Sequence, residues 1–128
     1  MIRAMIATSA VVAATALSPA IPAAAVQRAG RTDLILSYMA EAGYATAVKL
    51  RCDPDGGAHP KPIQACAELK KVGGRPDRLR PARMMCMLIY APVTAEITGT
   101  WQGRRIDWSK TYGNSCEMSR ATGVLFRF

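Results

Sequence analysis

The sequence predicts an α+β fold, in which one or two short helices lie over a mainly antiparallel sheet of about five strands. Short segments in which apolar and polar residues alternate indicate strands with one buried face. One further segment has apolar residues at near-helical spacing. Four cysteines fit a small domain whose apolar core alone leaves its stability marginal.

Residues 1–25 are predicted to be a secretory signal peptide that is not part of this fold. Arg3 is their only charge, residues 6–17 are apolar or small, and alanines at 23–25 offer a cleavage site. The apolar stretch is shorter than the roughly 20 residues that cross a bilayer, so no membrane anchor is expected. Residues 26–128 then form one secreted, extracellular domain of about a hundred residues.

Two strands and a helix are predicted in the first half of this domain. Residues 34–39 are mostly apolar, and residues 48–52 alternate apolar with charged side chains. Glycines and prolines interrupt residues 53–62, which predicts a loop without regular structure. Residues 63–71 then have near-helical apolar spacing before two glycines, which predicts a short helix that is attached through Cys66.

A hairpin is the clearest prediction for the second half. Apolar residues alternate with threonine and glutamate along residues 93–101. Gln102 and Gly103 supply a tight turn, after which residues 106–112 return as the second strand. Residues 124–128, which are β-branched and aromatic, complete the expected set of about five strands.

The cysteines are expected to form two disulfides in an oxidising compartment. Three pairings are possible, and the sequential one is favoured because it closes two local loops. It joins Cys52 to Cys66 and Cys86 to Cys116. A zinc site is the alternative, but no two cysteines are closely spaced and His59 is the only histidine. We therefore expect no metal and no cofactor.

Part of the net charge of +8 is concentrated between residues 70 and 83. Six basic residues occur there against the single acid Asp77: Lys70, Lys71, Arg75, Arg78, Arg80 and Arg83. Such a stretch could bind nucleic acid or an anionic surface. We expect a solvated face and no nucleic-acid partner, because no aromatic residue is interleaved with the charges. A cationic secreted module that binds an anionic polymer or another secreted enzyme is the alternative function.

No catalytic site is expected. Acid-base catalysis needs a base beside a nucleophile, and His59 lies between Ala58 and Pro60 in the predicted loop. A structural or exposed histidine is the expectation there. The sequence also has no phosphate-binding glycine loop and no evident group of carboxylates.

An uncharged apolar segment, residues 84–92, lies between the basic stretch and the hairpin. In a core strand its last residue, Pro92, would remove a hydrogen-bond donor, and it also biases Ala91 toward extended geometry. The segment is therefore predicted to be exposed and extended. An edge strand with buried apolar residues is the alternative.

Several motifs occur in order along almost the whole mature chain. They are Gly57-Ala58-His59-Pro60 after Cys52, Ala65-Cys66, Val72-Gly73-Gly74, Trp101-Gln102-Gly103 and Cys116-Glu117-Met118. In this order and cysteine spacing the sequence resembles the Streptomyces subtilisin inhibitor family. The resemblance implies a five-stranded antiparallel sheet with two short helices, the sequential disulfides, and a homodimer made through the sheet.

The resemblance also implies a serine protease inhibitor that presents one bond as a pseudo-substrate. The family's primary specificity residue is the second after the third cysteine, which places the reactive bond between Leu88 and Ile89. The implied protease-binding loop adds Met85, Cys86, Met87, Tyr90 and Ala91, with support from Pro92 and Asn114. Met87 replaces a common proline and Ala91 a usual aspartate, and both changes remove groups that stiffen the loop.

Physical arguments favour the same assignment. A protease binds substrate as an added extended strand, and a hydrophobic specificity pocket accepts Leu88 better than a pocket with a carboxylate at its base. The expected partner is an extracellular subtilisin-like or chymotrypsin-like protease. A bridge from Cys86 to Cys116 would lower the entropy lost on docking and hold the new amine of Ile89 near the acyl-enzyme.

Overall fold

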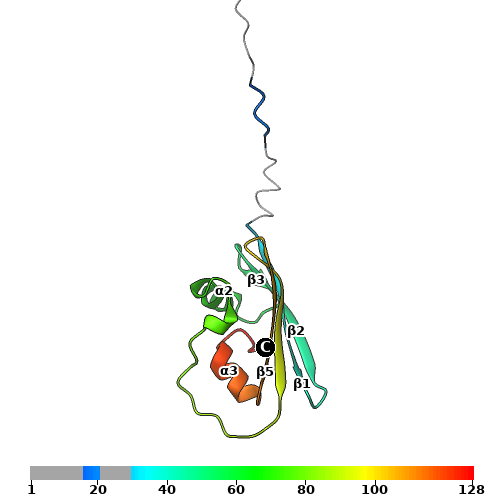
Figure 1. Cartoon of the computed structure of the whole chain (residues 1–128), viewed down its shortest axis with the longest axis vertical. Coiled ribbons are helices and arrows are strands. Elements are labelled where there is room, and N and C mark those ends of the chain that lie inside the picture. Colours follow the sequence, from blue (N-terminus) through cyan, green and yellow to red (C-terminus); the bar gives the residue numbers. More distant parts are fainter. Residues whose placement is uncertain (1–15, 21–29) are drawn as a thin grey trace, which may run out of the picture.

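Five antiparallel strands form one sheet, and two α-helices cover one of its faces (Figure 1). The computed structural model describes residues 16–20 and 30–128. The elements are β1 (Thr32–Ala40), β2 (Ala45–Cys52), β3 (Gly56–Gly57), α2 (Pro62–Lys71), the 3-10 helix η1 (Pro76–Arg78), β4 (Val93–Trp101), β5 (Arg104–Tyr112) and α3 (Ser115–Thr122). The predicted α+β class, the five-stranded antiparallel sheet and the two helices are confirmed.

The sheet has the strand order β3-β2-β1-β4-β5, so that β1 and β4 lie at its centre. Leu36 of β1 lies beside Ile97 of β4, and Leu34 lies beside Leu50 of β2. These four side chains are at most 1% exposed and point to the face that the helices cover. Each such burial contributes about 1.5–3 kcal/mol, so the alternation in the sequence marks the core.

Helix α2 is fixed to the sheet at its middle. Cys66 forms a disulfide with Cys52 at the end of β2, and Ala65 and Leu69 are buried beside it. The helix begins at Pro62, a favourable first helical residue because its missing N–H would have no helical partner. The predicted helix and its attachment through Cys66 are confirmed.

The fifth strand is not the predicted one. Gly56 and Gly57 form β3 inside the segment that was predicted to be a loop, and they pair with Arg51 and Leu50. Gly57 has a φ of 97°, and a Cβ there would collide with the backbone of Lys49. The glycines therefore allow a close backbone approach that side chains would block.

Residues 124–128 were predicted as a strand, and this prediction is wrong. Their backbone makes turns, with the Leu125 N–H donating to the Thr122 carbonyl. Leu125 and Phe126 are buried in the core between the sheet and the helices. The β-branched and aromatic composition reflects this burial and not strand pairing.

His59 holds this C-terminal segment in place. Its ring is 3% exposed, and its Nδ1 accepts a hydrogen bond from the Lys61 N–H at 3.0 Å. Its Nε2 therefore carries the proton and donates to the Leu125 carbonyl at 3.1 Å. His59 is a structural histidine, as one of the two predicted alternatives had it.

The predicted signal peptide, residues 1–25, lies outside the described residues except at positions 16–20. Among the described helices, none combines the length and the apolar character that crossing a bilayer requires.

Candidate functional site

Residues 84–92, called the exposed loop below, form an exposed apolar segment between η1 and β4. It contains no helix or strand, and Met85, Leu88 and Tyr90 are 98%, 100% and 85% exposed. The prediction of an exposed segment is confirmed, and the alternative of a buried edge strand is wrong. A contiguous exposed apolar segment is typical of an interaction site.

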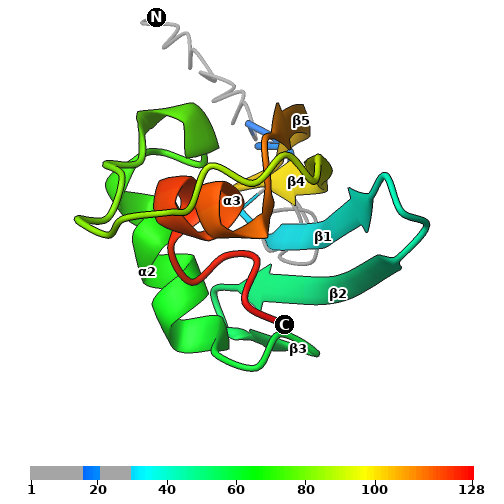
Figure 2. The same cartoon turned by 90° about the horizontal axis from the view of Figure 1, so that it is seen from below.

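Backbone hydrogen bonds tie both ends of this connection to the two ends of α3. Before the loop, the Ala82 N–H donates to the Arg120 carbonyl at 2.8 Å. Near the C-terminal end of the loop, the Ala91 N–H donates to the Gly113 carbonyl, just before α3, also at 2.8 Å. Figure 2 shows the yellow-green chain crossing in front of α3 between these points. Helix α3 and the residues next to it therefore hold both ends of the loop in place.

A disulfide fixes the loop between its two ends. Cys86 is bonded to Cys116 in the first turn of α3, which confirms the second predicted pair. Cys86 is half-buried, whereas its neighbours Met85 and Met87 are exposed. The covalent attachment lies two residues before Leu88.

Asn114 holds the loop on either side of Leu88. Its Nδ2 donates to the Met87 carbonyl at 3.3 Å and to the Ile89 carbonyl at 2.8 Å. Its Oδ1 accepts from the Glu117 N–H at 2.9 Å, which caps α3. Because the cap fixes the orientation of the amide, its two N–H groups point at the loop.

A short-range backbone hydrogen bond spans Leu88, and the backbone has no pronounced bend there. The Ile89 N–H donates to the Met87 carbonyl at 2.9 Å, which closes a three-residue turn. The Leu88 side chain at its centre is fully exposed. The loop thus presents one leucine outward from a backbone that is held on both sides.

Pro92 marks the end of the exposed loop. It is half-buried, lies directly before β4, and its carbonyl accepts a hydrogen bond from the Glu41 N–H at 3.0 Å. Because Pro92 lies outside the strand, its missing N–H costs the sheet no hydrogen bond, which agrees with the sequence-based prediction that this segment is not a core strand.

Three supports were missed by the sequence argument: Ala82, Gly113 and Arg120. They act through backbone groups that every residue except proline has, so no side-chain pattern distinguishes them. Helix α3 was expected only from the family resemblance. The spacing of Asn114 and Glu117, a cap followed three residues later by glutamate, is a signal that could have located its start.

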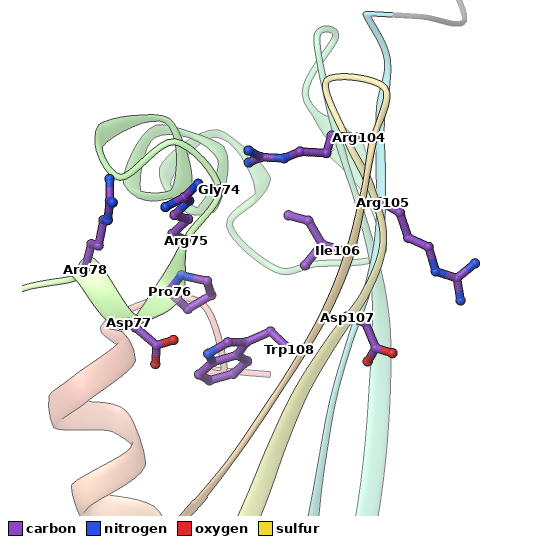
Figure 3. Close-up of a pocket in the computed structure, with 10 residues that line it drawn as sticks. All are labelled: Gly74, Arg75, Pro76, Asp77, Arg78, Arg104, Arg105, Ile106, Asp107 and Trp108. Carbon is purple, nitrogen blue, oxygen red and sulfur yellow. The ribbon is translucent and has the colours of Figure 1, made fainter.

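A cleft of about 490 Å³ between η1 and β5 is a second candidate site (Figure 3). Arg104, Ile106 and Trp108 point into it from alternate positions of β5, while Arg105 and Asp107 point to the other face of the sheet. The lining residues include no pair of nucleophile and base. The cleft adjoins the start of β5, whereas the exposed loop is tied to Gly113, just beyond its end. The two sites are therefore separate.

Comparisons with known proteins identify the family of this chain. The family model described as subtilisin inhibitor-like matches residues 32–114. "Subtilisin inhibitor-like protein 1" of Streptomyces cacaoi is 43% identical over 93 residues, which cover 70% of this chain and 84% of that protein. "Trypsin inhibitor STI2" of Streptomyces longisporus is 40% identical over 84 residues, covering 64% of this chain and 58% of that protein.

A solved structure has the same fold. It is Streptomyces caespitosus sermetstatin in complex with Bacillus licheniformis subtilisin, with a TM-score of 0.65 and 25% identity. The match covers 77% of this chain and 100% of that chain. The chain described here therefore belongs to the subtilisin inhibitor-like family.

Proposed function

We propose that this chain inhibits extracellular subtilisin-like serine proteases by presenting the bond between Leu88 and Ile89 as a pseudo-substrate. The family consists of protease inhibitors and not of enzymes. The observation that carries the proposal is the fully exposed Leu88 between two carbonyls that Asn114 holds.

Leu88 supplies the binding energy and the specificity. Burial of a leucine in a specificity pocket contributes about 1.5–3 kcal/mol. Met85, Met87, Ile89, Tyr90 and Ala91 are exposed on either side, where a protease would contact them as an added strand. A relative is named a trypsin inhibitor, but this chain offers no cation at position 88. A hydrophobic pocket is the matching partner.

The supports of the loop explain why net hydrolysis of the bond between Leu88 and Ile89 would be slow. After cleavage, Cys86 stays bonded to Cys116 on one side, and Ala91 stays tied to Gly113 on the other. The amine of Ile89 therefore stays near the acyl-enzyme, and religation competes with hydrolysis through proximity. The amide of Asn114 bridges both sides of the break and adds to this restraint.

Residual protease activity is the direct test. Purified residues 26–128 are titrated into subtilisin, and any nicked bond is identified by N-terminal sequencing. We expect stoichiometric inhibition with slow cleavage only after Leu88. Absence of inhibition, or rapid cleavage elsewhere, would overturn the proposal.

A substitution at Leu88 tests the assignment of the specificity residue. The Leu88→Lys variant should shift preference toward trypsin, because its pocket has a carboxylate at its base. Ile63→Lys is the matched control, since Ile63 is a 71% exposed apolar residue on α2, outside the loop. A Leu88→Lys variant with unchanged specificity would show that another residue enters the pocket.

Export and self-association complete the proposal. We propose cleavage of a signal peptide after Ala25, which N-terminal sequencing of the exported protein would test.

We also propose a homodimer through the uncovered face of the sheet, where Ile35 and Met39 are 49% and 57% exposed. An Ile35→Glu variant should then sediment as a monomer and the unchanged chain as a dimer. A monomeric unchanged chain would refute the dimer.

A further inference from the structure

Arg78, Arg80 and Arg83, called the basic stem below, are three exposed cations within the six residues directly before the exposed loop. None of them forms an ion pair within the part of the chain that the structure describes. The lysines earlier in the same basic stretch differ, because Lys70 pairs with Asp53 and Lys71 with Glu68, both at 2.7 Å. Within the described residues Arg75 is unpaired as well, but it lies further from the loop along the chain. The basic stem is therefore the unpaired part of this stretch that adjoins the loop.

The backbone of the stem is held in place. The Arg78 N–H donates to the Arg75 carbonyl at 3.0 Å within η1. Ala82, between the other two arginines, is tied to the Arg120 carbonyl at the end of α3. The three charges thus have a defined position relative to the loop, although their side chains are free to adapt.

The charge around the loop is asymmetric. Arg83 is five residues before Leu88, so their Cα atoms are at most about 17 Å apart in an extended chain. On the other side, residues 89–92 carry no charge, and the acidic residue Glu41 is bonded through its N–H to Pro92. In the chain that flanks Leu88 from residue 78 to residue 95, positive charge therefore lies only on the N-terminal side of the cleaved bond.

We infer that the preferred target is a serine protease with an acidic surface beside the subsites for residues on the N-terminal side of the cleaved bond. This inference rests on the proposed function and adds the chemistry of the partner. Complementary charge raises the association rate by about 10-fold to 1000-fold at low salt. Exposed pairs at the rim contribute little to the lifetime of the complex. The basic stem is then a steering element, and Leu88 is the anchor.

An anionic polymer would also be attracted to the stem. It would have no use for the adjoining exposed apolar loop, whereas a protease uses both features. The protease is therefore the partner that the adjacency favours.

Stopped-flow association with two surface variants of one subtilisin tests the inference. One variant carries aspartates, and the other lysines, at the rim of the groove that binds residues N-terminal to the cleaved bond. At low salt, the unchanged chain should associate about 10-fold faster with the aspartate variant. This preference should shrink toward 1 at high salt, with dissociation rates nearly equal.

The matched inhibitor variants locate the effect. The first changes Arg78, Arg80 and Arg83 to glutamine and should lose the preference. The second removes the same charge from Arg31, Arg51 and Arg105, which lie at or next to the opposite end of the sheet, and should keep it. Equal behaviour of the two variants would overturn the inference, because net charge alone would then explain steering.

Two further outcomes separate this inference from the function on which it rests. If neither subtilisin is inhibited by any variant, the proposed function fails. If inhibition persists without a charge preference, but the stem substitutions abolish binding to immobilised polyphosphate, the stem serves a polymer and the inference is overturned.

Discussion

The two disulfides of this chain lie in opposite environments. Cys52 and Cys66 are at most 1% exposed and join β2 to α2 within the core. Cys86 and Cys116 are half-buried and join an exposed loop to the first turn of α3. The first disulfide restrains the fold, whereas the second restrains a segment that contributes little to the core.

This difference implies that stability and inhibition are separable. The core depends on apolar side chains of the central strands and on α2. The loop depends on a small set of groups at the two ends of α3: Gly113, Asn114, Cys116 and the Arg120 carbonyl. Substitutions in one set should change one property and leave the other nearly unchanged.

Removal of the loop disulfide should have the largest effect on inhibition. In the Cys86→Ser, Cys116→Ser variant, we expect hydrolysis of the bond after Leu88 to rise by about 100-fold, because the cleaved ends are no longer held together. The accumulation of nicked chain with subtilisin, followed by mass spectrometry, measures this rate.

The core disulfide provides the matched control. The Cys52→Ala, Cys66→Ala variant should lose about 3 kcal/mol of stability in urea unfolding. Its folded fraction should be hydrolysed at the rate of the unchanged chain. Similar hydrolysis rates for the two disulfide variants would contradict the separation.

Two adjacent glycines test the core side of the comparison. Gly74 has a φ of 74°, and a Cβ there would lie 2.6 Å from the Trp101 ring. Gly73 has a φ of 62° with open space around it. Gly74→Ala should therefore cost about 3 kcal/mol, from backbone strain and overpacking, and Gly73→Ala about 1 kcal/mol. Urea unfolding measures both, and equal losses would show that Trp101 moves aside freely.

Substitution of Asn114 separates its two roles. Asn114→Ser keeps a side-chain oxygen for the helix cap but cannot reach the loop carbonyls, so hydrolysis after Leu88 should rise about 10-fold at nearly unchanged stability. Asn114→Ala should show the same hydrolysis and lose about 1 kcal/mol of stability as well. If the serine variant resists hydrolysis like the unchanged chain, the amide is not a support of the loop.

The sequence allowed the core and the exposure of the loop to be predicted, but not every support. Alternation in β2 and β4 is readable because one face of each strand is buried. Exposure of the loop followed from Pro92, which cannot donate to a sheet. Strand β3 consists of two glycines, which have no side chains to form a pattern. The supports of the loop at Gly113 and Arg120 are backbone carbonyls, which the amino-acid composition does not reveal.

Proline at position 87 should strengthen the loop modestly. Among the described residues, the Met87 N–H donates no hydrogen bond, so its loss removes none. A fixed φ lowers the conformational entropy of the flexible loop, which stabilises its ordered form by about 0.4–1 kcal/mol. Met87→Pro should therefore slow hydrolysis by about 2-fold to 5-fold. Faster hydrolysis would mean that the native backbone at position 87 does not fit proline.

Alkaline pH should weaken the fold slightly through Tyr112. Burial, and then the charge of Asp77, raise the pKa of the Tyr112 hydroxyl above its ordinary value of 10.0. The unfolded chain loses this proton at lower pH than the folded chain, so the contribution of Tyr112 to stability is lost as pH rises above 10.0. Tyr112→Phe should remove this part of the decline in urea unfolding without changing hydrolysis of the loop. An unchanged decline would assign it to other groups.

Religation of the nicked chain tests the central claim most directly. The chain is cleaved after Leu88 with both disulfides intact and is then purified. The purified nicked chain is incubated with a catalytic amount of subtilisin. We predict that the uncut chain reappears in measurable amount, because α3 holds both new ends near the enzyme. Nicked chain that never regains the bond between Leu88 and Ile89 would contradict the account.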